Sequence, residues 1–291
     1  MVSSVDGIVV VDKPAGLTSH DVVARLRRAL DQKRIGHSGT LDPDATGVLV
    51  IGVGRATRLL RFLTTLAKCY EGEVVLGTET STLDAGGDVT ATHLMDGVSL
   101  DEVRRAAAAF VGEIEQIPQM VSAVKVGGRR LHELARAGLE VERAPRPVTV
   151  WRLDVEPAGP GVFRMAVECS SGTYVRTLAA DLGRALGGGA HLRNLRRTAV
   201  GSFGLGEARP LDESGPGAVL PPAEAMRDDP AVAVGDATAA DVVHGRVLAA
   251  GAIGSDGGPG PWAVLDARGN LLAVYERHHD GRVKPAVVLS G

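Results

Sequence analysis

The sequence predicts an α+β fold with a mixed, largely antiparallel sheet flanked by helices, followed by a small β-rich C-terminal domain. Two observations predict this fold. Strand-like and helix-like segments are interleaved, and several strands are adjacent in the sequence, which favours a mixed sheet over a strict βαβ repeat. A segment rich in Pro and Gly then separates the larger part of the chain from a tail of short strands and turns.

The length of 291 residues is consistent with two domains. We expect a larger domain over residues 1–212, a linker over 213–229 and a small domain over 230–291. The linker boundaries follow from the run ESGPGAVLPPAEAMRDDP, whose prolines and glycines interrupt regular structure.

The first part of the chain alternates strands and helices. GIVVVDKPAG (7–16) is a buried strand that runs into a Pro-Gly turn, and GVLVIGVG (47–54) is a second buried strand. Residues 19–32 have the apolar spacing of an amphipathic helix, with Ser19 as the candidate N-cap. RATRLLRFLTTL (55–66) is expected to form a short helix.

The middle of the chain contains the strongest helix signal. In residues 99–112, Ser99 and Glu102 form a capping box and Gly112 is expected to close the helix. The alternation of residues 70–80 predicts a strand with one buried face. The other expected elements are strands at 147–157 and 162–172, a helix at 176–186 and a helix-closing turn at GGGAH (187–191).

The C-terminal part is expected to contain only short strands and turns. AVAVGDATAADVVHGRVLAAG (231–251) and the segment 261–289 are predicted to form strands, with turns at Asp-Ala-Arg-Gly and Asp-Gly.

Composition limits the cellular context. The chain is 44% hydrophobic and has no apolar run of 18 residues, and its first residues lack the basic region and long apolar stretch of a signal peptide. We therefore expect a cytoplasmic protein with no membrane association. The two cysteines lie 100 positions apart without CxxC spacing, which indicates neither a disulfide framework nor a zinc site.

Charge is distributed unevenly along the chain. The net charge of −3 argues against a uniformly basic nucleic-acid-binding protein. Residues 125–152 nevertheless carry seven basic groups against three glutamates, and a second basic run lies in residues 184–197. Such clusters either attract phosphates or form ordinary solvated faces of helices and loops.

Three segments contain candidate functional side chains. Asp42 lies between a Gly-Thr-Leu turn and a proline, just before the strand at 47–54. Tyr70 follows Lys68 and precedes the segment LGTETSTLDAGG, where Thr80, Thr82 and Asp84 are expected to hold a loop by side-chain-to-backbone hydrogen bonds. Tyr174 and Arg176 lie where a strand is expected to meet the helix at 176–186.

These segments together resemble the TruB family of tRNA pseudouridine synthases, which isomerise uridine 55 in the T-arm of tRNA. The resemblance spans most of residues 7–203, in family order, and GTLDP-x-ATG is its most specific signal. The matching segments are DKPAGLTSHDVV (12–23), GHSGTLDPDATGVLVIGVGRATR (36–58), KCYEGEVVLGTETSTLDAGGD (68–88), SAVKVGGRRLHELARAG (122–138) and CSSGTYVRTLAADLGRALGGGAHLRNLRR (169–197).

The resemblance implies a role for individual residues. Asp42 matches the catalytic aspartate, Tyr70 the tyrosine that stacks on the target base, and Arg176 the arginine paired with the aspartate. A further set is implied to line the pocket or contact RNA: His37, thought to help open the T-loop, Tyr174, Leu195, Lys13, Pro14, and Lys125, Arg129 and Arg130 of an RNA-clamping insertion at about 119–146. The C-terminal part resembles a PUA domain.

The implied reaction accounts for these residue types. Pseudouridine formation breaks the N1–ribose bond, turns the uracil and joins C5 to the same sugar carbon, so it requires no redox cofactor, metal or ATP. An ionised carboxylate can act in this reaction as a nucleophile or as a base. Whether Asp42 attacks the sugar, adds to the ring or removes the 2′ proton stays open. We expect no cofactor and no bound metal.

The expected substrate is the T-arm of tRNA, and we expect a monomer that needs no protein partner. Two alternatives remain open. The scaffold could serve as a non-catalytic RNA-binding or tRNA-folding module, or it could act on other targets with guide RNAs, as relatives do. The intact set of Asp42, Tyr70 and Arg176 favours the tRNA enzyme.

Overall fold

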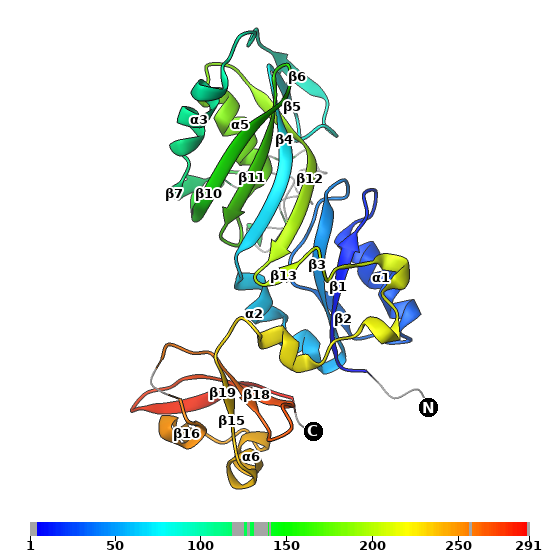
Figure 1. Cartoon of the computed structure of the whole chain (residues 1–291), viewed down its shortest axis with the longest axis vertical. Coiled ribbons are helices and arrows are strands. Elements are labelled where there is room, and N and C mark those ends of the chain that lie inside the picture. Colours follow the sequence, from blue (N-terminus) through cyan, green and yellow to red (C-terminus); the bar gives the residue numbers. More distant parts are fainter. Residues whose placement is uncertain are drawn as a thin grey trace. The chain divides into compact units, whose positions relative to one another are not determined.

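The computed structural model describes residues 5–117, 125–126, 129–130, 139, 141–255 and 258–289. It consists of two compact units (Figure 1). Unit 1 combines Met1–Leu66 with Ala199–Gly291, and unit 2 is Ala67–Thr198.

Unit 1 is built around the two buried strands that the sequence predicts. β1 (Gly7–Lys13) and β3 (Thr46–Val53) are antiparallel, with Gly7 opposite Val53 and Lys13 opposite Gly47. β2 (Ile35–His37) also pairs with β3, and β14 (Arg209–Pro210) runs parallel to β1. Nearly every residue of β1 and β3 is buried, as expected for continuous apolar runs.

The first helix, α1 (Ser19–Ala29), corrects one detail of the sequence analysis. Its N-cap is Thr18, not Ser19. The Thr18 backbone is extended, its hydroxyl accepts a hydrogen bond from the Asp21 amide (3.1 Å), and the Asp21 carboxylate accepts one from the Thr18 amide (2.9 Å). This capping box leaves the Ser19 hydroxyl available for contacts outside the helix.

The expected short helix after β3 begins as 3₁₀ turns. η1 (Gly54–Leu59) continues into α2 (Leu60–Thr65). Arginines recur here every third residue, a spacing that aligns side chains on a 3₁₀ helix. Arg55 donates to the carbonyl of Leu289 (2.5 Å) and Arg58 to that of Val288 (2.5 Å). This row of arginines therefore holds the end of the C-terminal sheet.

The C-terminal sheet has the order β15-β17-β18-β19-β16. Its strands are β15 (Ala231–Ala233), β16 (Leu248–Ala249), β17 (Trp262–Leu265), β18 (Leu271–Arg277) and β19 (Arg282–Val288). The turn expected at Asp266 is confirmed, because its carboxylate accepts the amides of Arg268 and Asn270 (both 2.8 Å).

The prediction of only strands between residues 231 and 251 is wrong. Residues Asp236–Val243 form helix α6, and Ala250–Ile253 form the 3₁₀ turn η5. The sequence DATAADVV contains three alanines, the strongest helix former, and an acidic residue in the first turn. These local preferences outweigh the weak strand pattern.

The Pro- and Gly-rich segment at 213–229 packs against β1. It forms η3 (Pro216–Ala218) and η4 (Pro222–Met226) after η2 (Leu211–Glu213). Leu220 exchanges two backbone hydrogen bonds with Ile8, at 3.0 and 2.8 Å. The predicted domain boundaries at 212 and 229 stay a prediction, but this segment contributes directly to the packing of unit 1.

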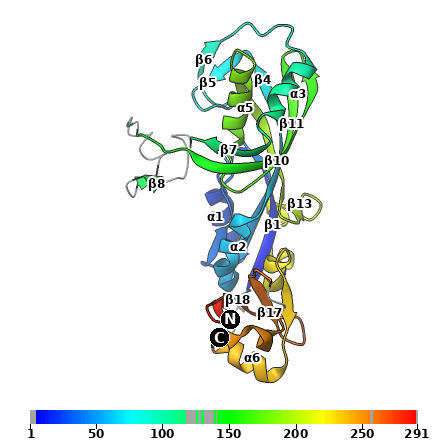
Figure 2. The same ribbon diagram turned by 90° about the vertical axis from the view of Figure 1, so that its left-hand side faces the viewer.

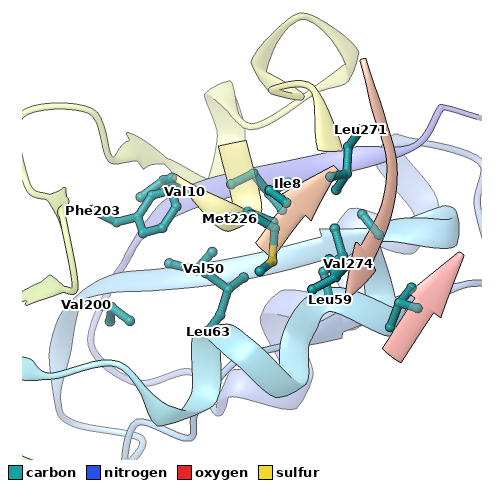
Figure 3. Packing of buried hydrophobic residues seen from close by; sticks show 14 of the residues in the cluster. Ile8, Val10, Val50, Leu59, Leu63, Val200, Phe203, Met226, Leu271 and Val274 are labelled. Atoms are coloured by element: carbon teal, nitrogen blue, oxygen red, sulfur yellow. The ribbon is translucent and has the colours of Figure 1, made fainter. Parts of the chain in front are cut away.

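One hydrophobic cluster joins the strands of unit 1 to the C-terminal sheet (Figure 3). It draws on β1, β3, η1, α2, η4 and the C-terminal strands. Its fully or nearly fully buried members include Ile8, Val10, Val50, Leu59, Leu63, Val200, Phe203, Met226, Leu271 and Val274. The C-terminal sheet therefore shares a core with β1 and with β3, which begins directly after the Asp42 segment.

Unit 2 contains strands in the order β12-β4-β11-β10-β7. They are β4 (Lys68–Leu76), β7 (Gly112–Gln116), β10 (Arg146–Gly159), β11 (Val162–Cys169) and β12 (Ala190–Val200). The pairs β4–β11, β11–β10 and β10–β7 are antiparallel. Burial alternates along β4, which confirms the predicted strand with one covered face.

The helices of unit 2 are α3 (Leu100–Ala108) and α5 (Val175–Ala185), and α3 packs against β10 and α5. The capping box of Ser99 and Glu102 is confirmed. Gly112 does not close α3, because the helix ends at Ala108 and Gly112, at φ +112°, begins β7. The turn after α5 is confirmed, with Gly187 at φ +84°.

Short hairpins complete unit 2. The chain turns at Gly77 into β5 (Thr78–Thr80), which pairs with β6 (Val89–Thr92). Within the insertion predicted at 119–146, β8 (Lys125–Val126) pairs with β9 (Arg129–Arg130). Figure 2 shows β8 beyond the ends of β7 and β10.

These elements confirm the predicted fold class, a mixed and largely antiparallel sheet with few helices followed by a β-rich C-terminal part. In the described ranges, no helix has both the length and the apolar composition needed to span a bilayer.

Candidate active site

The Asp42 loop, residues 38–45, connects β2 to β3 and is fixed at both ends by strand pairing. His37 pairs with Ile51, and the amide of Ser38 donates to the carbonyl of Val50 (3.0 Å). Within the loop, the amide of Ala45 donates to the carbonyl of Asp42 itself (3.2 Å). Asp42 is half-buried at the centre of this turn.

The residue before Asp42 is held by Ser19, the first residue of α1. The Ser19 hydroxyl accepts a hydrogen bond from the Leu41 amide (2.8 Å) and lies 3.2 Å from the Leu41 carbonyl, to which it donates. Ser19 is 2% exposed and Leu41 is 4% exposed. Both backbone groups of Leu41 are therefore satisfied by one buried side chain, and the loop is tied to the start of the helix.

The residue after Asp42 is held by Lys13, the last residue of β1. The Lys13 ammonium donates to the carbonyls of Pro14 (2.9 Å), Leu17 (2.6 Å) and Pro43 (2.9 Å). The Pro43 carbonyl also accepts the amide of Gly16 (2.9 Å). Lys13 has 0% exposed surface, so these carbonyl dipoles solvate a charge that has left water.

Lys13 and Pro14 were expected to contact RNA. The buried ammonium of Lys13 instead holds the turn that follows β1 against the Asp42 loop, which is a positioning role. Pro14 is exposed within that turn. The direct contact of either residue with RNA stays a prediction.

His37 lies next to a second histidine that the sequence analysis did not single out. The ring centroids of His37 and His20 are 6.4 Å apart, with an angle of 83° between the ring planes. His20 follows Ser19 on α1 and is exposed, whereas His37 is half-buried on β2. The only local signal for His20 is its position in the segment TSHDVV.

In unit 2, Tyr70 and Lys68 lie on the covered face of β4. Tyr70 is 8% exposed and pairs with Val167 of β11. Lys68, two residues earlier and 6% exposed, pairs with Cys169. The covered face therefore places an aromatic ring and a buried amine side by side along one strand.

Burial sets the titration of the groups beside Tyr70. Loss of water contact, followed by the nearby charge of Arg197, lowers the pKa of Lys68 to about 8. Burial also raises the pKa of the Cys169 thiol to about 11, so this thiol is neutral at physiological pH. Cys69 and Cys169 are both free thiols.

Arg176, at the first turn of α5, binds a loop of unit 2. Its guanidinium donates to the Thr82 carbonyl (3.0 Å) and to the Asp84 carboxylate (3.0 Å). The Thr82 hydroxyl donates to the same carboxylate (2.6 Å), and the Thr80 hydroxyl donates to the Asp84 carbonyl (2.7 Å). The predicted loop is confirmed, and Arg176 is an additional partner that the sequence did not reveal.

The pairing of Arg176 with Asp42 would join a residue of unit 2 to one of unit 1, and it stays a prediction. Arg176 is 6% exposed and forms an ion pair with Asp84. This ion pair contributes to the orientation of its guanidinium within unit 2.

Tyr174 occupies the N-cap position of α5 and is held by Gln116, which the sequence analysis missed. The Tyr174 amide donates to the Gln116 side chain (2.9 Å), which in turn donates to the Tyr174 carbonyl (3.3 Å). Gln116 is 2% exposed at the end of β7. Leu195 is half-buried on β12.

For the basic residues of the insertion, the structure describes only how their backbones pair. Lys125 lies opposite Arg130 in the β8–β9 hairpin, and Arg129 lies opposite Val126. Their side chains, like residues 118–124, 127–128, 131–138 and 140, lie outside the described part of the chain. Their contact with RNA stays a prediction.

Replacing Lys13 by methionine should destabilise the protein. The change removes the donor that the carbonyls of Pro14, Leu17 and Pro43 share and, among the contacts that the structure describes, leaves only Pro43 with a second donor, the Gly16 amide. An unsatisfied buried group costs about 1–3 kcal/mol. We expect a clear decrease in the free energy of unfolding, measured by urea titration with circular dichroism. Lys33→Met, at an exposed lysine, should change it by less than about 0.5 kcal/mol. Equal stabilities of the two variants would contradict the role of Lys13.

The lowered pKa of Lys68 predicts a pH-dependent stability. Between pH 8 and 10.5, the unfolded chain retains a proton that folded Lys68 has released, so the free energy of unfolding rises with pH in this window. Relative to Lys68→Met, the wild type should gain about 1–2 kcal/mol between pH 7.5 and 9.5. Urea titrations at three pH values measure this difference, and parallel pH profiles would refute the shift.

Comparison with known proteins supports the family resemblance that the sequence motifs indicate. The family model described as TruB family pseudouridylate synthase (N terminal domain) matches residues 27–175. A model for the tRNA pseudouridylate synthase B C-terminal domain matches 176–213, and one described as tRNA pseudouridine synthase II, C terminal, matches 230–290.

Individual relatives match over nearly the whole chain. The tRNA pseudouridine synthase B of Mycobacterium sp. (strain KMS) is 47% identical, covering 97% of this chain and 96% of the relative. That of Symbiobacterium thermophilum is 51% identical, covering 84% and 83%.

Solved structures agree in fold. A chain of a Cbf5-Nop10-Gar1 complex matches with a TM-score of 0.73 and 29% identity, covering 93% of this chain and 78% of that one. A chain of an H/ACA RNP bound to a substrate RNA matches with a TM-score of 0.75 and 25% identity, covering 98% and 85%. Taken with the family models, these matches show that the chain belongs to the TruB family of pseudouridylate synthases, which are isomerases.

Proposed function

We propose that this protein converts uridine 55 in the T-arm of tRNA to pseudouridine, with Asp42 as the catalytic carboxylate and without a cofactor. Relatives named tRNA pseudouridine synthase B support tRNA as the substrate. The observation that carries the proposal is the construction of the Asp42 loop, where the residues on both sides of Asp42 are held by buried donors and acceptors.

A fixed loop suits this chemistry. The carboxylate must meet a single atom of the bound nucleotide, and positioning a reacting group before the substrate arrives lowers the barrier. The clamps act on the backbone of Leu41 and Pro43, so they fix the loop without using the side chain of Asp42.

The bonds to carbon that break and form in the reaction all belong to the target uridine. The N1–C1′ bond breaks, a C5–C1′ bond forms, C5 loses its proton, and N1 gains one. In the proposed mechanism, the ionised Asp42 serves as nucleophile or base during the transfer. Sugar attack, ring addition and removal of the 2′ proton are the three routes open to it.

Tyr70 and Arg176 have supporting roles in the proposal. Tyr70 stacks on the uracil and its phenol relays the C5 proton. Arg176 keeps Asp42 ionised through a charge-assisted hydrogen bond. Its contacts with Thr82 and Asp84 hold the guanidinium within unit 2. Tyr174 and Leu195 would line the same pocket.

The remaining residues bind RNA in the proposal. His37 takes the place of the extruded uridine in the folded T-loop. Lys125, Arg129 and Arg130 of the β8–β9 hairpin contact phosphates of the T-arm. The protein acts as a cytoplasmic monomer, with no guide RNA and no protein partner.

Asp42→Asn tests the proposal directly. With an unmodified tRNA transcript carrying 5-tritiated uridine, the purified wild-type protein should release tritium without added metal or nucleotide. Asp42→Asn should lower the release rate by at least about a thousandfold, because amide nitrogen and oxygen are poor nucleophiles and bases, and should bind RNA within a few-fold of wild type.

Asp44→Asn is the matched control, since Asp44 is an exposed aspartate two residues away. It should retain wild-type turnover. Tritium release by Asp42→Asn at the wild-type rate would end the catalytic assignment. RNA binding without any release by the wild type would favour the non-catalytic module, and release only after addition of a guide RNA would favour the guided enzyme.

A further inference from the structure

Two imidazole rings meet at the edge of the Asp42 loop. The rings of His20 and His37 are nearly perpendicular, at 83°, with centroids 6.4 Å apart. This edge-to-face arrangement lies in the range of separations at which aromatic pairs attract each other. Both residues belong to unit 1, so their arrangement is set within one compact body.

Each ring belongs to a residue whose neighbours in the chain help to hold the Asp42 loop. His37 is the last residue of β2, paired with Ile51, and the loop begins directly after it. His20 follows Ser19, whose hydroxyl bonds to both backbone groups of Leu41. The relative position of the two rings is therefore fixed by the same contacts that fix Asp42.

The two histidines differ in exposure. His37 is half-buried, whereas His20 is exposed and its ring stands nearly perpendicular to that of His37. A half-buried ring on a short strand has two broad χ2 orientations, and a neighbouring ring that stands nearly perpendicular to it favours one of them. His20 thus has the geometry of a support for the His37 ring.

We propose that His20 is a positioning residue for His37, holding its ring in the orientation that enters the T-loop stack when the target uridine is extruded. This inference rests on the proposed function, since it specifies how that site opens its RNA substrate. It gives His20 no direct part in the isomerisation itself.

The local charge argues against a phosphate contact as the role of His20. The next residue, Asp21, is ionised within the capping box, and its carboxylate accepts hydrogen bonds from the amide (2.9 Å) and hydroxyl (2.6 Å) of Thr18. These bonds keep the pKa of Asp21 below its ordinary value. A fixed negative charge beside His20 disfavours an approaching phosphate, so ring support is the better reading.

The test measures base extrusion apart from chemistry. A T-arm stem-loop with 2-aminopurine beside the target uridine is mixed in a stopped-flow instrument with proteins in the Asp42→Asn background. His20→Ala should slow the fluorescence rise by about two- to tenfold, the range expected from loss of one ring contact, and leave the Kd for RNA within twofold. His20→Phe, which keeps an aromatic ring at this position, should restore the rate.

A double-mutant cycle tests whether His20 acts through His37. If His20 acts through His37, then His20→Ala should have no further effect once His37→Ala is present. His279→Ala, at an exposed histidine in the turn between β18 and β19, is the control and should leave the rate unchanged.

Three results would overturn the inference: an unchanged extrusion rate in His20→Ala, the same slowing in the His37→Ala background, or rescue by His20→Lys but not by His20→Phe. The last would indicate a phosphate contact. These outcomes are separable from failure of the proposed function, in which the protein with both histidines intact would show no extrusion and wild type would release no tritium.

Discussion

The Lys13 ammonium is the interaction on which the candidate site depends. A buried lysine must find acceptors for all its protons, and Lys13 finds three carbonyls, one of them the residue after Asp42. This requirement fixes the turn after β1 against the Asp42 loop. Ser19 supplies the second anchor from the start of α1. Asp42 thus lies between two backbone positions that buried side chains hold in place. The conformation of its loop is therefore set before any substrate binds.

The shared core of unit 1 explains why this loop can be rigid. β1, which ends at Lys13, and β3, which follows the Asp42 loop, pack on one hydrophobic cluster with the C-terminal strands (Figure 3). Arg55 and Arg58 add charge-assisted hydrogen bonds to the last carbonyls of that sheet. The C-terminal part therefore stabilises the strands that hold the site, and this role does not depend on contact with RNA. In unit 2, Gln116 and Asp84 act in the same way on Tyr174 and Arg176.

The sequence predicted what local patterns determine. The buried strands, the alternating β4 and the Ser99 capping box were all readable, because each depends on residues a few positions apart. The N-cap of α1 was placed one residue late because Ser is a slightly better N-cap than Thr by type. The residue that decides for Thr18 is Asp21, which completes a capping box with it. Helix α6 was missed because eight residues carry a weak periodicity. The contacts of Lys13 with Pro43 and of Arg176 with Asp84 span 30 and 92 positions, so no local pattern contains them.

Hydrogen exchange of the Asp42 loop tests the central claim, that the loop is held in place before RNA binds. The amides of Leu41 and Ala45 donate to Ser19 and to Asp42, and both residues are buried. In the free protein, these two amides should exchange at least about a hundredfold more slowly than an unstructured chain. Addition of a T-arm RNA should change their protection by less than about threefold. Rapid exchange in the free protein that becomes slow only with RNA would show a loop ordered by its substrate, and would contradict the account.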